Sequence, residues 1–216
     1  MSLCRTIDAV LFDLGNVLVG WDPCAAFDGV LTRAEVEAFF TDIDFVERNR
    51  SADAGTPWEE VRASVAAAHP QHAGLLDRYV ERFSSTLTGP VPGTSEIVDE
   101  LVGLEVPVFG LTNWSAELFH LAQPAAPVIG LLRGVVVSGE EWMAKPDPAI
   151  FELTVRRFGL DPARTVFVDD AEANVRAADS LGFQTVHFTD ASALRVRLVD
   201  LGVVPALDDG GGSSAS

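Results

Sequence analysis

Residues 9–19 read AVLFDLGNVLV, an apolar run that is interrupted by one carboxylate, Asp13, and then by a glycine, Gly15. A continuous apolar run next to a turn-forming glycine is typical of a buried strand. We predict a strand over 9–14, with Asp13 near its end and a turn at Gly15 that leaves the carboxylate beside exposed backbone amides. An aspartate at a strand end is by itself also a common turn or capping residue, so the rest of the sequence must decide its role.

The composition is that of a globular chain with one sizeable core, because 48% of the 216 residues are hydrophobic. The 15 Lys and Arg residues face 32 Asp and Glu residues, and the net charge of −17 repels phosphate backbones and anionic membrane surfaces. No apolar stretch approaches the length of a membrane span or of a signal sequence. We therefore expect a cytoplasmic protein that binds neither nucleic acid nor membranes. The sequence does not indicate an oligomeric state.

Short apolar runs alternate with amphipathic segments of helical length along most of the chain. This alternation is typical of a parallel sheet with crossover helices, so we predict an α/β fold with a Rossmann-like sheet and helices on both faces. The predicted strands cover 9–14, 106–112, 134–138, 165–169 and 184–188. The predicted helices that follow them cover 94–102, 115–121, 148–158, 171–181 and 191–201.

The interval from 23 to 88 is different, because it has helical periodicity and no convincing strand. Apolar residues recur at spacings of three and four over 33–40, 58–68 and 75–87. Residues 89–93, GPVPG, form a stiff return linker. We predict a core over 1–20 and 89–205, an inserted helical cap over 21–88, and a disordered tail over 206–216 that is rich in glycine and serine.

Polar residues also follow three of the later predicted strands. Thr112 and Asn113 can donate hydrogen bonds to an anion, although a helix cap is the simpler interpretation. Lys145 precedes a proline that restricts its backbone. Most lysines are simply solvated, so a solvated side chain is the simpler interpretation here too. The open edge of an α/β sheet binds ligands at the carboxyl ends of its strands, so these residues lie where a site is expected.

The pair Asp169 and Asp170 follows an apolar strand, with Asn174 about one helical turn later. Adjacent carboxylates at the end of a buried strand repel one another unless a cation compensates, and oxygen ligands of this kind suit Mg²⁺. Taken alone, the pair could equally cap the following helix.

Together, these four positions resemble the haloacid dehalogenase superfamily of hydrolases. The resemblance covers residues 6–202 and its motifs match at Asp13, Thr112, Lys145 and the pair Asp169-Asp170. The chain looks most like the phosphatases of subfamily IA, which carry a helical cap of the C1 type after the first strand. That group includes sugar phosphatases and the N-terminal phosphatase domain of soluble epoxide hydrolase.

The resemblance implies a Mg²⁺-dependent phosphomonoester hydrolase in which Asp13 attacks phosphorus and forms an aspartyl phosphate. The implied metal ligands are Asp13, the backbone carbonyl of Gly15 and Asp170. Asp169 and Asn174 would lie just outside this ligand set, Asn174 at a place where many relatives carry another acid. The phosphoryl group would be held by Asn16, Thr112, Asn113 and Lys145. The substrate would be a small phosphorylated metabolite, such as a sugar phosphate.

Gly15 departs from the family pattern, because most phosphatases of this superfamily have there a second Asp that protonates the leaving oxygen. A positioned acid or base contributes about 10² to 10⁴ in rate. Relatives with the same Asp-Leu-Gly-Asn form include active sugar phosphatases, so the change weakens the prediction of phosphatase activity without cancelling it. Asp22 could substitute for the missing acid, but it is also the expected turn or cap residue before Pro23.

Four further residues are candidate substrate contacts: Trp21, Asn49, Arg50 and Trp114. The two tryptophans flank the predicted crevice and could equally pack in the core, whereas Asn49 and Arg50 belong to a charged segment that could equally be a solvated face. Trp58 and Trp142 are assigned to packing.

Two other functions remain open. A 2-haloacid dehalogenase would use Asp13 as nucleophile without needing an acid at Gly15, because halide leaves unprotonated; the pair Asp169-Asp170 argues against it. A non-catalytic phosphate-binding or regulatory domain would also explain the missing acid, but it has no need for a charged nucleophile.

Overall fold

A computed structural model describes residues 7–206 of the chain, so the tail predicted over 206–216 lies outside the described residues from 207 onward. The five predicted strands all form and pair in parallel in the order β5-β4-β1-β6-β7, which confirms the α/β class. Their bounds are β1 Ala9–Phe12, β4 Val108–Thr112, β5 Val135–Val137, β6 Thr165–Asp169 and β7 Gln184–His187. The chain starts in the middle of the sheet, builds one side and then crosses to the other, so β4 and β6 flank β1 at a topological switch point.

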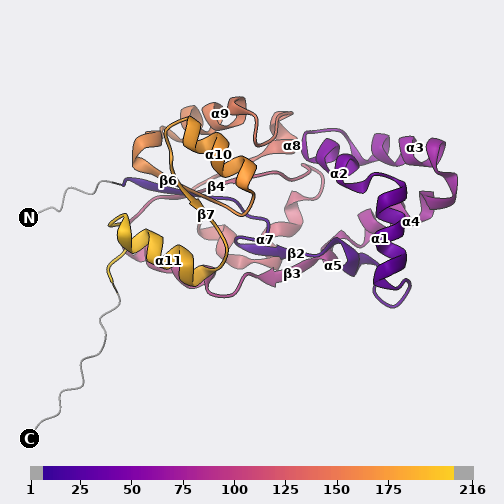
Figure 1. Cartoon of the computed structure of the whole chain (residues 1–216), viewed down its shortest axis with the longest axis horizontal. Coiled ribbons are helices and arrows are strands. Elements are labelled where there is room, and N and C mark those ends of the chain that lie inside the picture. Colours follow the sequence, from indigo (N-terminus) through magenta and orange to yellow (C-terminus); the bar gives the residue numbers. More distant parts are fainter. Residues whose placement is uncertain (1–6, 207–216) are drawn as a thin grey trace, which may run out of the picture.

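The alternation of side chains along β1 explains the layers on both faces of the sheet. Leu11 belongs to an apolar cluster with α9 (Pro148–Phe158) and α10 (Glu172–Ser180). Val10 and Phe12 point the other way, into a cluster with α6 (Thr94–Gly103) and α11 (Ala191–Asp200). Figure 1 shows α9 and α10 above the sheet and α11 below it.

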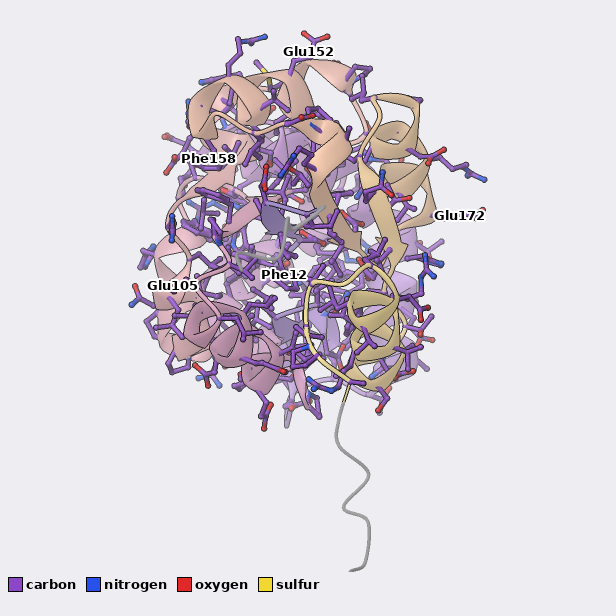
Figure 2. All side chains as sticks on the ribbon, turned by 90° about the vertical axis from the view of Figure 1, so that its left-hand side faces the viewer. Phe12, Glu105, Glu152, Phe158 and Glu172 are labelled. Atoms are coloured by element: carbon purple, nitrogen blue, oxygen red, sulfur yellow. The ribbon has the colours of Figure 1, made fainter. Side chains whose placement is uncertain are left out.

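Figure 2 looks at the molecule from the end opposite the helical insertion and draws all side chains of the described residues. Phe12 lies in the interior, where it is fully buried, whereas Glu105, Glu152 and Glu172 lie at the periphery and are exposed. The acidic residues that are labelled therefore stand away from the core.

Capping residues stand at both ends of α9, the helix that follows Lys145. The Asp147 carboxylate accepts a hydrogen bond from the Ala149 N–H at 2.9 Å, and Pro148 occupies the first helical position. Gly159 ends the helix in the left-handed conformation, with φ of 64°. The helix accordingly matches its predicted bounds, 148–158.

The insertion lies between two short antiparallel strands, β2 (Val19–Trp21) and β3 (Leu87–Pro90), and its helices gather at one end of the molecule (Figure 1). The α-helices are α1 Arg33–Asp42, α2 Phe45–Asp53, α3 Trp58–Ala68, α4 Ala73–Glu81 and α5 Phe83–Thr86. Short 3₁₀ turns cover Pro23–Phe27 and Pro70–His72. The boundaries of a separate cap domain at 20/21 and 88/89 stay a prediction.

Three expectations for this region were wrong. The helix predicted over 75–87 is split into α4 and α5, and α2 was not predicted because only three of its nine residues are apolar. A strand, β3, begins at Leu87 and takes in the start of the expected linker. Strands of three or four residues leave too short a pattern for periodicity to detect.

The insertion has its own aromatic core, which continues into the sheet layer. Phe40 stacks on Phe45 with ring centroids 4.0 Å apart, and Tyr79 meets Phe45 edge-on at 4.9 Å. Phe83 contacts Trp114, which follows β4, at 5.9 Å. This last contact joins the insertion to the carboxyl edge of the sheet.

The helix predicted over 115–121 was also wrong. A 3₁₀ turn at Phe119–Leu121, the short helix α7 (Ala122–Ala125) and a second 3₁₀ turn at Pro127–Leu131 occupy this region. The Leu118 N–H bonds to the Ser115 carbonyl three residues back, and Pro127 ends α7. No helix in the described part of the chain is long and apolar enough to cross a bilayer.

Gly139 provides a test of how tightly the segment after β4 is packed. It lies in α8 (Ser138–Glu141), and a Cβ there would come within 2.5 Å of the Ala116 nitrogen and 2.8 Å of the Trp114 carbonyl oxygen. Because backbone atoms cannot rotate away, we expect Gly139→Ala to lower the free energy of unfolding by about 1–3 kcal/mol. Thermal and urea unfolding measure it.

The control is Gly103→Ala, at the exposed end of α6, where a Cβ meets nothing within 4 Å. We expect this change to be neutral or to stabilise the protein by about 0.5–1 kcal/mol. Equal stability of the two variants would show that the contact at Gly139 is loose.

Candidate active site

A buried ion cluster lies at the carboxyl ends of β1 and β6. The Lys145 Nζ atom is 2.9 Å from Asp13 Oδ1 and 2.6 Å from Asp169 Oδ2. All three residues are less than 10% exposed. Residues that are far apart in the sequence thus meet as their order along the sheet predicts.

Lys145 is held by its backbone as well as by its ammonium group. The ammonium also donates to the Leu111 carbonyl at 2.8 Å. The side chain of Asn113 accepts from the Lys145 N–H at 2.8 Å and donates to the Lys145 carbonyl at 2.9 Å. The peptide bond between Lys145 and Pro146 is cis. The Asn113 amide therefore positions Lys145; the role predicted for it in holding phosphate stays a prediction.

Hydrogen bonds from Asn174 and from the backbone hold the Asp169 carboxylate in place. The Asn174 amide donates to both carboxylate oxygens of Asp169, at 3.0 and 3.1 Å, and the Ala171 N–H donates to Asp169 at 2.8 Å. With Lys145 in addition, the Asp169 carboxylate is saturated by donors. The expectation that Asp169 and Asn174 lie outside the direct ligand set of a metal stays a prediction.

Asn16 organises the turn that follows Asp13. Its backbone is left-handed, with φ of 55°, a conformation that asparagine tolerates better than most residues. Its side chain accepts from the Trp21 N–H at 3.1 Å and hydrogen-bonds to the Asp170 carboxylate. It thus ties Asp170 to the start of the insertion; its predicted contact with substrate stays a prediction.

Burial and mutual repulsion shift the pKa values of the cluster. Burial raises the pKa of Asp13 to about 7; Lys145 opposes this shift and Asp169 adds to it. Burial and the neighbouring Asp169 also raise the pKa of Asp170. Burial works against the Lys145 ammonium, but Asp13 and Asp169 outweigh it and raise its pKa. For Asp13 and Asp170, the attraction of one ammonium group therefore does not offset burial and carboxylate repulsion.

The donor set fits a divalent cation. Oxygen atoms of Asp13, Asp169 and Asp170 all lie within 4.8 Å of one another. Carboxylates at this spacing around a hard cation are the ligands that Mg²⁺ prefers, and the cation would relieve their repulsion. Gly15 adjoins Asp13 in the turn, so its carbonyl remains a predicted ligand.

A cavity of about 80 Å³ opens beside this cluster, between the sheet edge and the insertion. Five of the residues that line it are predicted site residues: Gly15, Trp21, Asn49, Asn113 and Trp114. The other five lining residues are Asp53, Trp58, Phe83, Ser115 and Leu118. Thr112 is buried at the end of β4.

Two of the predicted site residues lie elsewhere. Arg50 is exposed and pairs with Glu47 at 3.3 Å, as expected of a solvated face. The Asp22 carboxylate accepts from the Cys24 N–H at 3.0 Å and pairs with Arg33 at 3.3 Å, so it caps the turn at Pro23–Phe27. Neither residue lines the cavity.

Sequence reasoning missed several residues of the cavity because their helices or their partners could not be predicted. Asp53 ends α2, which was not predicted, and only the folded chain brings it to Gly15. Trp58 packs as expected, at 1% exposed, but it also lines the cavity. Trp142 was wrongly assigned to packing, because it is 70% exposed and lies over Gly55.

The comparisons with known proteins agree with this geometry. Residues 7–182 match the model of the haloacid dehalogenase-like hydrolases. This chain belongs to that family. It is 30% identical over 209 residues to the sesquiterpene phosphatase astK of Aspergillus oryzae, a match that covers 92% of this chain and 98% of the relative.

Solved structures of haloacid dehalogenase family members have the same fold. A family enzyme from Bacteroides thetaiotaomicron, in complex with magnesium and inorganic phosphate, matches with a TM-score of 0.64 and 25% identity over 85% of this chain and 95% of that one. The L-2-haloacid dehalogenase of Xanthobacter autotrophicus matches with a TM-score of 0.63 and 20% identity over 92% and 85%. Structural neighbours thus include both a phosphate complex and a dehalogenase.

We expect Mg²⁺ to raise the melting temperature of this hydrolase, and to raise it more at pH 8 than at pH 5. The native Asp13, with a pKa of about 7 against 3.8 for the free side chain, binds protons more tightly than the unfolded chain does. Its stabilising effect in the metal-free protein is therefore present at low pH and lost as the pH rises from about 4 to 7. Mg²⁺ competes with those protons, so ionisation strengthens its binding.

Asp170→Asn should reduce this Mg²⁺-dependent shift, whereas Asp200→Asn, at an exposed ion pair with Arg197, should keep it. Thermal unfolding with and without Mg²⁺ at the two pH values gives the measurement. A shift that is the same in both variants would remove Asp170 from the metal site.

Proposed function

We propose that this protein is a Mg²⁺-dependent phosphomonoester hydrolase that acts through an aspartyl phosphate on Asp13. The supporting observation is the cluster itself, in which the Lys145 ammonium contacts the carboxylates of Asp13 and Asp169 and a third carboxylate, that of Asp170, lies close to both. Such an arrangement is costly to bury unless a cation and an anionic substrate complete its charge balance. A cytoplasmic location and the absence of nucleic-acid and membrane partners are part of the same proposal.

The residues have distinct tasks in this reaction. Asp13 attacks phosphorus in line and splits one difficult hydrolysis into two easier displacements. Lys145 holds Asp13 in place through a 2.9 Å contact and offers positive charge to the phosphoryl oxygens. Asp170 and Asp13 would hold Mg²⁺, together with the Gly15 carbonyl. Bound Mg²⁺ would neutralise the charge that the nucleophile and the phosphate bring together.

Dehalogenation is the competing reaction, because the family includes both activities. The carbon-halogen bond of a 2-haloacid needs no metal, whereas the spacing of Asp13, Asp169 and Asp170 favours a cation. A purely phosphate-binding domain would not need Asp13 at all. The identity to a protein named as a sesquiterpene phosphatase also supports phosphate ester hydrolysis.

The lining of the cavity favours a leaving group with a largely apolar body over a sugar. The side chains of Trp21, Trp58, Phe83, Trp114 and Leu118 form much of its wall. The indole N–H groups of Trp58 and Trp114 are buried without a hydrogen-bond partner among residues 7–206, so one or two oxygen acceptors of a ligand would complete them. A short aliphatic or prenyl alcohol phosphate meets both demands.

Purified protein with Mg²⁺ should release phosphate from phosphomonoesters and no chloride from 2-chloropropionate. Asp13→Asn should abolish phosphate release while the protein stays folded, because the amide cannot act as the nucleophile. The control is Asp77→Asn, at an exposed ion pair with Arg62. Chloride release, or full activity of Asp13→Asn, would contradict the proposal.

A panel of leaving groups tests the character of the cavity. We expect kcat/KM for dimethylallyl phosphate to exceed that for glucose 1-phosphate by about ten-fold or more, the usual effect of one well-placed apolar group. Leu118→Asn should reduce this preference, because it makes the wall polar at nearly constant size. Leu131→Asn, at a leucine that is 43% exposed, is the matched control. A preference for the sugar phosphate would overturn the assignment.

A further inference from the structure

The turn after Asp13 has no acid that could protonate a leaving group. Gly15 carries no side chain, and a Cβ built there meets nothing within 4 Å, so the space beside it is open to the cavity. An alkoxide is a poor leaving group and needs a proton as the bond to phosphorus breaks. If the proposed hydrolysis takes place, another residue must reach this space.

Asp53 is the one titratable side chain among the described residues that line the cavity with Gly15. It is the last residue of α2 and approaches the sheet edge from the insertion. The same wall includes Asn113, which positions Lys145. The Gly15 turn and Asp53 therefore line the same cavity.

The Asp53 carboxyl group is held in place from two parts of the chain. The Asn49 amide donates to its Oδ2 atom at 2.9 Å, and the Tyr79 hydroxyl fixes that amide by donating to its oxygen at 3.4 Å. The backbone N–H of Ser115, which follows β4, donates to the carboxylate. The Asp53 backbone carbonyl accepts from the hydroxyl of Ser138, the first residue of α8. A surface carboxylate has no such set of partners.

The protonation state of Asp53 suits a proton donor at neutral pH. The residue as a whole is partly exposed, but burial of its carboxyl group raises the pKa of Asp53 to about 7. The negative charge of Asp13 raises this pKa further, whereas the hydrogen bond from the Ser115 N–H lowers it. The other titratable group that faces it is Tyr79. Burial raises the pKa of the Tyr79 hydroxyl well above its ordinary value. A carboxyl group with this pKa exists in both forms near pH 7.

We propose that Asp53 is the general acid and base that replaces the acid missing at Gly15; this inference rests on the proposed phosphatase function. As Asp13 bonds to phosphorus, the bond to the leaving oxygen breaks and that oxygen takes the proton of Asp53. The Asp53 carboxylate then removes a proton from a water molecule. The oxygen of this water attacks phosphorus, the bond to Asp13 breaks, and phosphate leaves with Asp53 protonated again.

Asp22 is the competing candidate and has a different environment. Its carboxylate is bound by the Cys24 N–H and by Arg33, and it does not line the cavity. A carboxylate held by these partners outside the cavity is not placed to give a proton to a leaving group inside it. Replacing each aspartate by asparagine therefore tells the two candidates apart, because only the true proton donor should show a loss of kcat/KM that depends on the leaving group.

Two substrates with different leaving groups test the proposal. For Asp53→Asn, we expect kcat/KM with an alkyl phosphate to fall about 10² to 10⁴-fold. With p-nitrophenyl phosphate, kcat/KM should fall less than about ten-fold, because nitrophenolate leaves without a proton. Slow hydrolysis of the aspartyl phosphate should then give a burst of nitrophenolate equal to the enzyme concentration. A merely structural role of Asp53 produces neither the difference between substrates nor the burst.

The controls separate this inference from the function on which it rests. Glu47→Gln removes one negative charge from an exposed position of the same helix, and it should leave kcat/KM for both substrates unchanged. Asp53→Glu should recover part of the alkyl phosphatase activity, and a retained Mg²⁺-dependent melting shift shows that Asp53→Asn is folded. An equal loss with both substrates, or a leaving-group effect in Asp22→Asn instead, would overturn the role of Asp53. If the native protein hydrolyses neither ester, the proposed function itself fails.

Discussion

The structure depends on one buried ammonium group, that of Lys145, which contacts Asp13 and Asp169 at the carboxyl edge of the sheet. Without it, two carboxylates would face each other in a protein interior, where an unpaired charge is strongly unfavourable. Its position is in turn fixed by Asn113 and the Leu111 carbonyl, both at the end of β4. Three strands thus converge on a single cation, so the sheet order and the charge balance of the site constrain each other.

Sequence alone predicted the core well, because its signals are local. The strands β1 and β6 contain short apolar runs, and α9 is bounded by the capping residues Asp147 and Gly159. Asp13, Lys145 and the acidic pair were found because each follows a strand, and strand ends in a parallel sheet meet at one edge. The three-residue strand β2 and the polar helix α2 gave no such signal.

What the sequence could not predict were contacts between distant segments. Asn113 and Asn16 have the residue type of phosphate ligands, yet their side chains hold Lys145 and Asp170, which is visible only in the fold. Asp53 meets Ser115 and Ser138, far along the chain, through hydrogen bonds that no periodicity encodes. Residue type and strand order therefore located the site, whereas the division of tasks within it came from three-dimensional packing.

The placement of Asp53 also changes what the insertion does. In relatives with an acid at the position of Gly15, nucleophile and proton donor share one turn of the core. Here the proposed proton donor, Asp53, comes from α2. Its carboxylate accepts from the Ser115 N–H and its backbone carbonyl accepts from the Ser138 hydroxyl, so its position depends on α2 lying against the sheet layer. The same packing places Trp58 and Phe83 in the wall of the cavity. Closure over the substrate and delivery of the proton then depend on one interface, and leaving-group specificity and catalysis cannot vary independently of each other.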